Sequence, residues 1–211
     1  MDLQKTDLFR KVALNTGVTR GVGRGVAQKL ANRGCSLLIT CSTPASLTHV
    51  ASLQNEIDKI FGGDTGIAHP SVTGIVANVH KHDCARETAD VLSETFGNRV
   101  DIVILNAVAA YATFVGQLDA NQVSKSLFAN IQTNAFIVDE LVKRRAFRRD
   151  SRIIILISSV RYRIPWKGQL MHAAGKAAGE SMYRTWAKAF GGKHEEVDFV
   201  ASCQTSARIR Y

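Results

Sequence analysis

The sequence predicts an α/β protein built as a three-layer, doubly wound parallel sheet, and three observations lead to this fold class. The apolar runs are short, β-branched and unalternating, which is typical of strands buried on both faces of a parallel sheet. Amphipathic stretches of helical length separate these runs. A glycine-rich turn joins the first apolar run to the first amphipathic stretch. Strands and helices that alternate in this way indicate right-handed βαβ units.

Each element follows from this pattern in chain order. Strands are expected at Val12–Asn15, Leu37–Thr40, Gly74–Asn78, Asp101–Leu105, Ile153–Ile157 and Val197–Ala201. Helices are expected at Gly23–Arg33, Ala45–Ile60, Ala85–Phe96, Asn121–Arg145 and Gly168–Phe190. Phe61–Thr73 contains three glycines and a proline and is expected to be a surface loop. No repeat or linker interrupts the alternation, so we expect a single domain over residues 1–211.

Composition narrows the class of protein. A chain of 211 residues with 45% hydrophobic and 21% charged residues is ordinary for one globular domain with a real core. The first eleven residues are charged and no apolar run reaches membrane-spanning length, so we expect a cytosolic protein without a membrane partner. The cysteines form no C-x-x-C pair, which favours free thiols and no metal site; they are Cys35, Cys41, Cys84 and Cys203.

The net charge of +9 raises the question of a nucleic-acid partner. The densest basic run follows the amphipathic stretch that ends near Val142 and precedes the strand that begins at Ile153. Cations at a helix C-terminus complement the helix dipole, so we expect a solvated helix end and no nucleic-acid partner. The run consists of Lys143, Arg144, Arg145, Arg148, Arg149 and Arg152.

The glycine-rich turn, Leu14-Asn15-Thr16-Gly17-Val18-Thr19-Arg20-Gly21-Val22-Gly23, is the strongest functional motif. Glycines at a strand-to-helix turn let the backbone approach a pyrophosphate, and the helix N-terminus adds N–H donors and a positive dipole end. This context predicts a nucleotide site of the Rossmann type. Its expected ligand-binding residues are Gly17, Thr19, Arg20, Gly21, Val22 and Gly23.

The end of the second predicted strand bears on the choice of cofactor. NAD-preferring domains place an acidic residue there to hold the ribose hydroxyls. Here the strand ends in Thr40-Cys41-Ser42-Thr43, and the first carboxylate after it is Glu56. Arg20 lies in the turn itself and can pair with a 2′-phosphate. With Ser42 as a further contact, this favours NADP(H) over NAD(H).

From Lys11 to about Ala207 the chain resembles the short-chain dehydrogenase/reductase family. It carries the family's complete T-G-x-x-x-G-x-G turn. The family's Asn-Ala-Gly after the fourth strand corresponds to Asn106-Ala107-Val108, with a bulky residue in the place of glycine, and implies that Asn106 belongs to the cofactor site. Asn78 stands where an aspartate commonly meets the adenine. The resemblance further implies that Asn130 supports a proton-relay water and that Ser159 is the catalytic serine.

The resemblance departs at the family's Tyr-x-x-x-Lys, because thirteen residues after Ser159 the sequence reads His172-Ala173-Ala174-Gly175-Lys176. A spacing of four places His172 and Lys176 on one helix face. In the family the lysine holds the nicotinamide ribose and lowers the tyrosine pKa. Histidine titrates near pH 6.5, and a neighbouring ammonium lowers its pKa further, so His172 is expected to be a mostly neutral base and donor. Neither Tyr162 nor Tyr183 is followed by a lysine at the required spacing.

Family members normally continue beyond the sixth strand with a helical segment over the substrate and a seventh strand. Here Ser202-Cys203 replaces the family's Pro-Gly and the sequence stops at Tyr211, so we expect a fold that is C-terminally truncated relative to the family. Helices 121–145 and 168–190 form the usual dimer surface in relatives, which implies a homo-oligomer.

These observations lead to an NADP(H)-dependent oxidoreductase that acts on a carbonyl or alcohol of a small molecule. Its expected catalytic residues are Asn130, Ser159, His172 and Lys176. Aromatic and apolar residues expected near the carboxyl ends of the strands are Tyr111, Phe114, Trp166 and Met171. Two alternatives stay open: a non-redox isomerase or cyclase in which neutral His172 moves protons, and a catalytically inactive nucleotide-binding protein.

Overall fold

Six parallel strands form one sheet in the part of the chain that the computed structural model describes, which is residues 7–62, 69–148, 152–164, 166–190 and 197–204. The strands are β1 (Val12–Thr16), β2 (Ser36–Cys41), β3 (Val72–Val76), β4 (Ile102–Leu105), β5 (Arg152–Ser159) and β6 (Val197–Gln204). Their order in the sheet is β3-β2-β1-β4-β5-β6. This is the doubly wound order, and the chain reverses direction across the sheet between β1 and β4. The predicted fold class and all six predicted strands are confirmed.

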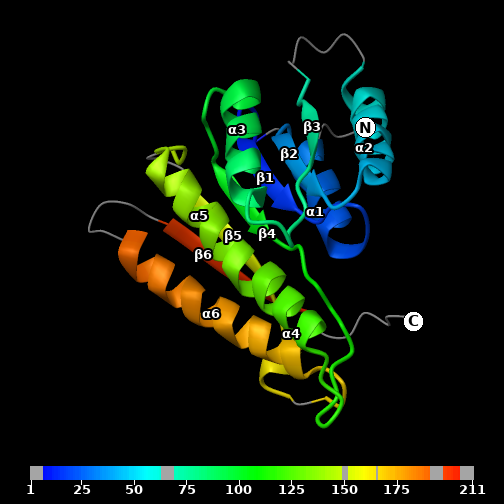
Figure 1. Cartoon of the computed structure of the whole chain (residues 1–211). Coiled ribbons are helices and arrows are strands. Elements are labelled where there is room, and N and C mark those ends of the chain that lie inside the picture. The colour runs from blue at the N-terminus through cyan, green and yellow to red at the C-terminus, as the bar shows by residue number, and fades with distance from the viewer. Residues whose placement is uncertain (1–6, 63–68, 149–151, 165, 191–196, 205–211) are drawn as a thin grey trace.

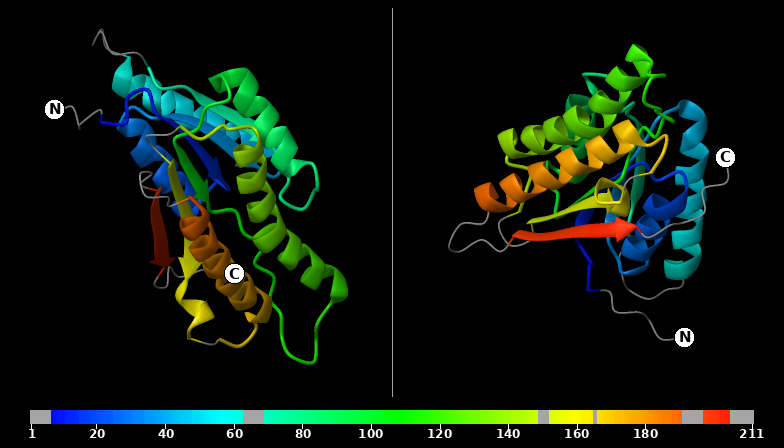
Figure 2. Two further views of the ribbon diagram at one scale, coloured as in Figure 1. Left: turned by 90° about the vertical axis from the view of Figure 1, so that its left-hand side faces the viewer. Right: turned by 90° about the horizontal axis from the view of Figure 1, so that it is seen from below.

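Helices cover both faces of the sheet (Figure 1). They are α1 (Gly21–Asn32), α2 (Leu47–Phe61), α3 (Cys84–Phe96), α4 (Ala120–Leu127), α5 (Thr133–Lys143) and α6 (Leu170–Phe190), with single turns η1 (Pro44–Ser46) and η3 (Val160–Tyr162). Two views at right angles show α1 and α2 on one face and α3, α5 and α6 on the other (Figure 2).

The buried side chains divide into two apolar clusters, one on each face of the sheet. Leu14 of β1 faces the cluster that contains Leu92 of α3 and Leu141 of α5. The preceding residue, Ala13, faces the other cluster, which contains Leu53 and further buried residues of α1 and α2. Successive strand residues therefore point into opposite layers, which explains why the strand sequences are apolar without alternation.

The stretch predicted as one helix, Asn121–Arg145, is wrong in detail. It consists of α4, a π-helical turn η2 (Phe128–Gln132) and α5. The wide turn contains Asn130, whose carboxamide binds the backbone of Ala109 in the loop after β4. π-Turns often occur at functional sites, because the extra residue redirects a side chain. Helical periodicity does not signal such a turn.

Several predicted boundaries also shift. β3 begins at Val72 and ends at Val76, not Asn78, since Val76 pairs with Cys41, the last residue of β2. The predicted loop at 61–73 is correspondingly shorter, and its residues 63–68 lie outside the described part of the chain. α6 begins at Leu170, because Gly168 has a φ of +76° and its carbonyl accepts from the backbone of Thr113.

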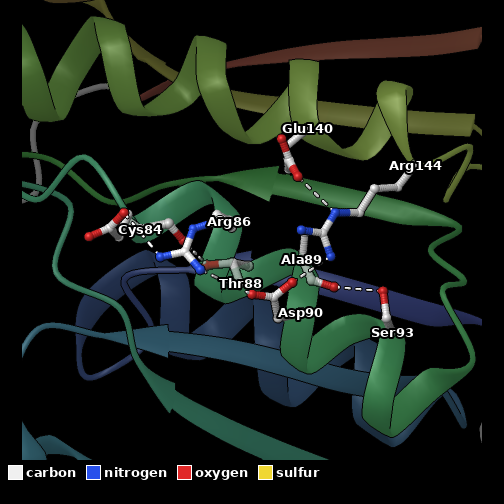
Figure 3. A network of polar contacts seen from close by, with 9 residues as sticks. Cys84, Arg86, Thr88, Ala89, Asp90, Ser93, Glu140 and Arg144 are labelled. Carbon is white, nitrogen blue, oxygen red and sulfur yellow. Dashed lines mark hydrogen bonds and ion pairs between the residues drawn. The ribbon is translucent and has the colours of Figure 1, made fainter.

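A network of ion pairs joins α3 to α5 (Figure 3). Arg144 follows α5, donates to Glu140 at 2.8 Å, and reaches across to Asp90 of α3 at 2.7 Å. Arg86 also approaches Asp90, at 3.7 Å. Within the predicted basic run, Lys143 lies 2.6 Å from Asp139 in an exposed pair. These pairs agree with the prediction that the run completes a helix end, although Arg149 and the Arg152 side chain lie outside the description.

The predicted free thiols are confirmed for Cys35, Cys41 and Cys84, which are buried and unpaired, while the Cys203 side chain is not described. Burial raises the pKa of Cys35 to about 12 and that of Cys84 to about 11. Among the described residues, no helix has the length and hydropathy needed to cross a bilayer.

Candidate active site

The turn between β1 and α1 is fixed by the end of β4, the neighbouring strand. Gly17 and Gly21 adopt left-handed backbone angles, with φ of +71° and +59°. Asn106 donates through its carboxamide to the carbonyl oxygens of Thr16 at 2.9 Å and Gly17 at 2.8 Å. The Thr16 hydroxyl accepts from the backbone N–H groups of Asn106 and Ala107, both at 3.0 Å. The turn is therefore a preformed structure that does not depend on a ligand for its shape.

Two glycines of this turn allow close contacts that a side chain would prevent. A Cβ on Gly17 would lie 2.8 Å from the Cα of Ala107. A Cβ on Gly23 would lie 2.4 Å from both the Asn106 carboxamide nitrogen and the Gly17 carbonyl oxygen. Gly25, two residues further along α1, faces open space instead. Gly17 and Gly23 thus have a packing role that the spacing of the motif alone does not show.

A cleft of about 480 Å³ opens at the carboxyl ends of β1, β2, β3 and β4. Such a crevice, beside the point where the strand order reverses, is where open α/β sheets bind ligands. Seven predicted cofactor-binding residues line it: Gly17, Thr19, Arg20, Gly21, Val22, Ser42 and Asn106. Gly23, Asn78 and Lys176 are not among its lining residues, and the Asn78 carboxamide oxygen accepts from the His80 backbone at 3.0 Å.

Further residues line the cleft that the sequence motifs do not indicate, because they come from the ends of several strands. They are Thr40, Cys41, Ala77, Val79, His80, Ala107 and Val108. His80 lies against Tyr111, with ring centroids 6.5 Å apart, and its buried Nδ1 has no hydrogen-bond partner among the described residues. Val108 is 42% exposed on the cleft wall. The position of His80 and Val108 in the sequence could have indicated this, since each follows the carboxyl end of a parallel strand.

The cleft offers several features that fit a dinucleotide phosphate. No side chain caps the first turn of α1, and no acidic residue occurs in that turn, so its N–H groups face the cleft unopposed. No carboxylate is among the lining residues. The exposed Arg20, the residue before α1, supplies a guanidinium at the rim. The preformed glycine turn, the free amides and the positive charge together fit the pyrophosphate of a dinucleotide.

The four predicted catalytic residues come from η2, from the end of β5 and from α6, and α6 packs against the other two elements. Ser159 ends β5, and its hydroxyl accepts from the Arg161 backbone at 3.3 Å. Lys176 of α6 donates to the carbonyl of Ile157 in β5 at 2.5 Å. A Cβ on Gly175 of α6 would lie 3.0 Å from the Cβ of Asn130 in η2, which shows how closely these two helices pass.

The surroundings of this region lower the pKa of two basic groups in the first half of α6, His172 and Lys176. Burial, followed by the charges of Lys176 and Arg161, lowers the pKa of His172 below its usual value. Burial lowers the pKa of Lys176 to about 8. The Nδ1 atom of His172 is buried and has no hydrogen-bond partner among the described residues. A neutral imidazole with an unpartnered nitrogen can act as a general base at neutral pH.

The side chain of Asn130 is hydrogen-bonded to the loop after β4. Its carboxamide oxygen accepts from the Ala109 N–H at 2.8 Å, and its nitrogen donates to the Ala109 carbonyl at 2.9 Å. Its backbone carbonyl accepts from the side chain of Asn134 at 3.1 Å. The side chain of Asn130 therefore fixes the loop after β4.

A second cavity, of about 390 Å³, lies between the loop after β4 and the start of α6, and we call it the aromatic cavity. Of the predicted aromatic and apolar residues, Phe114 and Trp166 line it, whereas Tyr111 lies against His80 and Met171 donates through its backbone to Thr113. Its lining residues are Thr113, Phe114, Val115, Trp166, Lys167, Gly168, Gln169, Leu170 and Ala173.

Comparison with known proteins agrees with this geometry. A family model described as short chain dehydrogenase matches residues 11–209. The chain belongs to the short-chain dehydrogenase family. The resemblance seen in the sequence is thereby confirmed, while the roles of individual site residues, including His172 in the place of the tyrosine, stay predictions.

Among curated relatives of the family, L-xylo-3-hexulose reductase of Hypocrea jecorina is 29% identical over 191 residues. L-xylulose reductase of Aspergillus niger is 28% identical over 192 residues. The matches cover 84% of this chain in both cases, but only 61% and 62% of those relatives, so the chain spans about three fifths of their length. A short-chain dehydrogenase from Burkholderia cenocepacia, solved in complex with NADP, is 25% identical and has a TM-score of 0.77, covering 92% of this chain and 74% of that one.

No group of three or more metal-ligating side chains occurs in the part of the chain that the structure describes.

Proposed function

We propose that the protein is an NADP(H)-dependent oxidoreductase that interconverts a carbonyl group and an alcohol on a small molecule. The observation that carries this proposal is the cleft at the carboxyl ends of β1 to β4, lined by seven residues of the predicted cofactor site. Membership of the short-chain dehydrogenase family and the NADP complex of the Burkholderia relative support it.

In this proposal the glycine turn and the first amides of α1 bind the pyrophosphate. Arg20 binds the 2′-phosphate, since it brings a positive charge to a cleft whose lining contains no carboxylate. Ser42, at the end of β2, donates a hydrogen bond on the same side of the cleft. Asn106 acts indirectly, because it holds the turn through Thr16 and Gly17.

At the reacting centre the bound dinucleotide supplies or accepts a hydride. The Ser159 hydroxyl, which accepts from the Arg161 backbone, keeps its own proton available for donation to the substrate oxygen. His172 exchanges a proton with that oxygen through its ring. Lys176, protonated below a pKa of about 8, holds the nicotinamide ribose, and its charge adds to the effect of burial in lowering the pKa of His172. Asn130 is a positioning residue, because its carboxamide is taken up by Ala109.

The cofactor half of the proposal is tested by titrating the purified chain with NADPH and with NADH and following the melting temperature. A ligand at about 100 times its Kd adds about 2.7 kcal/mol to the free energy of unfolding, which is readily detected. We expect NADPH to bind more tightly, Arg20→Ala to remove most of that preference, and Lys29→Ala, which removes an exposed cation in the last turn of α1, to leave it intact. Absence of stabilisation by either dinucleotide would refute the proposal.

The redox half is tested by transfer of deuterium from 4-deuterated NADPH to the carbonyl carbon of a ketone or aldehyde panel. Deuterium in the alcohol product supports hydride transfer. A product that forms without deuterium, with the dinucleotide unchanged, would assign the site to proton transfer.

That second function, an isomerisation or cyclisation catalysed by proton transfer, is favoured by one observation. His172 combines a lowered pKa with a buried, unpartnered Nδ1, which is suitable for a neutral general base.

A further inference from the structure

Of the two segments that form the aromatic cavity, the loop after β4 is uncharged and the segment from β5 into α6 carries only positive charge. No aspartate or glutamate occurs between Asp101 and Asp119, or from Ile153 to Gly179. These segments contribute every residue of the cavity wall, and Lys167 is part of it. They meet at one end of the molecule, where the backbone of Thr113 donates to the Gly168 carbonyl at 2.8 Å (Figure 1). The cavity is thus electropositive as well as apolar.

Arg161 connects this cavity to the predicted catalytic residues. Its backbone N–H donates to the Ser159 hydroxyl at 3.3 Å, and its guanidinium carbon lies 4.4 Å from the ring centroid of Trp166. Trp166 is a wall of the aromatic cavity. The charge of Arg161 also reaches His172, where it contributes to the lowered pKa of the imidazole. One side chain therefore touches the cavity wall and influences the reacting centre.

The guanidinium of Arg161 has no carboxylate partner among the described residues. In contrast, Arg24, Arg33 and Arg144 each lie within 4 Å of an acidic side chain. Stacking on Trp166 fixes the plane of the guanidinium and leaves its N–H edge for another ligand. A half-buried cation without a counter-ion is stabilised by a bound anion, and the planar fork matches a carboxylate.

We propose that Arg161 binds the substrate, and that the substrate is an apolar carbonyl compound that carries a carboxylate group. This inference rests on the proposed function, because it names the substrate class of the same site. Trp166 and Phe114 pack against the apolar body, Arg161 pairs with the carboxylate, and Ser159 and His172 meet the carbonyl oxygen. A neutral polyol would leave the guanidinium unpaired and the aromatic wall poorly covered.

The test uses para-acetylbenzoate and its neutral near-isostere para-acetylbenzamide as probes, with binding measured by calorimetry in the presence and absence of NADP⁺. We expect the wild-type chain to bind the acid at least about tenfold more tightly than the amide, as a charged hydrogen-bonded pair provides. Arg161→Gln should abolish this preference. Arg163→Gln is the matched control, since Arg163 is exposed, lies over Tyr162, and should leave the preference unchanged.

Equal affinity of the wild-type chain for acid and amide, binding of neither probe, or a preference that survives Arg161→Gln would each overturn the proposal. If Arg161→Gln does not fold, Arg161→Lys keeps the charge but loses the fork, and a weakened preference is expected. The readout is binding, so a preference for the acid without deuterium transfer would count against the oxidoreductase function alone.

Discussion

The carboxamide nitrogen of Asn106 lies 2.8 Å from the carbonyl oxygen of Gly17 and donates a hydrogen bond to it. The two residues are 89 positions apart in the chain. Through this contact the end of β4 determines the shape of the glycine turn after β1, so the cleft in which we propose that the cofactor binds depends on the correct pairing of these strands.

We therefore expect Asn106→Leu to weaken NADPH binding by about tenfold or more, because two turn carbonyls lose their donor. Asn98→Ala is the control. It also removes a carboxamide, which donates to the Arg144 carbonyl at 2.7 Å, but it precedes β4, at the end of the strand away from Asn106, and does not line the cleft. Asn98→Ala should lower the melting temperature and leave the NADPH Kd unchanged. Equal Kd values for both variants would contradict the role assigned to Asn106.

Gly23→Ala and Gly25→Ala each add one methyl group to α1, the first in a tightly packed position and the second in open space. At Gly23 the methyl would lie 2.4 Å from Asn106 and the Gly17 carbonyl, whereas at Gly25 nothing lies within 4 Å. We expect Gly23→Ala to destabilise the chain and abolish NADPH binding. Gly25→Ala should instead stabilise it by about 0.5–1 kcal/mol, because alanine favours the helix. Urea unfolding and NADPH titration of both variants provide the measurement.

His172→Tyr should raise the rate of ketone reduction by about 100-fold or more, since a phenol held beside Lys176 is a stronger transition-state proton donor than a neutral imidazole. The measurement is NADPH consumption with a panel of ketones. Ala174→Tyr adds the same phenol at an exposed position of α6 and should change nothing. A His172→Tyr variant that binds NADPH normally and stays inactive would favour a nucleotide-binding protein without redox activity.

Lys176 makes stability depend on pH in a definite direction. Its pKa in the fold is about 8, below the ordinary value of 10.5. Between these values the unfolded chain holds the proton and the folded chain does not, so the free energy of unfolding rises with pH. Between pH 8 and 9 we expect the wild type to gain up to about 1 kcal/mol relative to Lys176→Met. A difference between the two that is constant or falls over this window would show that Lys176 is not desolvated.

This comparison also separates the lysine from the thiols. The raised pKa values of Cys35 and Cys84 act in the opposite sense, since their unfolded forms lose protons above the ordinary value of 9.0. Both proteins contain these thiols, so their contribution cancels in the difference.

Arg144→Met should destabilise the chain by about 1 kcal/mol, because it removes the cation that joins Asp90 of α3 to Glu140 of α5. Lys143→Met is the neighbouring control. Its pair with Asp139 is exposed and lies within one helix, so we expect little effect on the urea midpoint. Equal losses for the two variants would indicate that the contact between α3 and α5 contributes nothing beyond a surface ion pair.

The sequence by itself determined the succession of strands and helices along the chain, the parallel sheet and the glycine turn. These features are local. Apolar runs such as Leu37–Thr40 indicate strands buried on both faces of a sheet, and Gly17, Gly21 and Gly23 indicate a strand-to-helix turn. The motif spacing also predicts Ser159, His172 and Lys176 as catalytic residues; Ser159 ends β5 and Lys176 bonds to Ile157 of the same strand.

Only the tertiary structure decided what these residues contact. The π-turn around Asn130 depends on its bond to Ala109, and the lining of the cleft by His80 and Val108 depends on which strands are neighbours. The stacking of Arg161 on Trp166 connects the end of β5, where the predicted catalytic Ser159 lies, to a cavity that no sequence pattern predicts. The physical reason is that periodicity records whether a residue is buried, whereas its partners are set by the packing of segments that are distant in the chain.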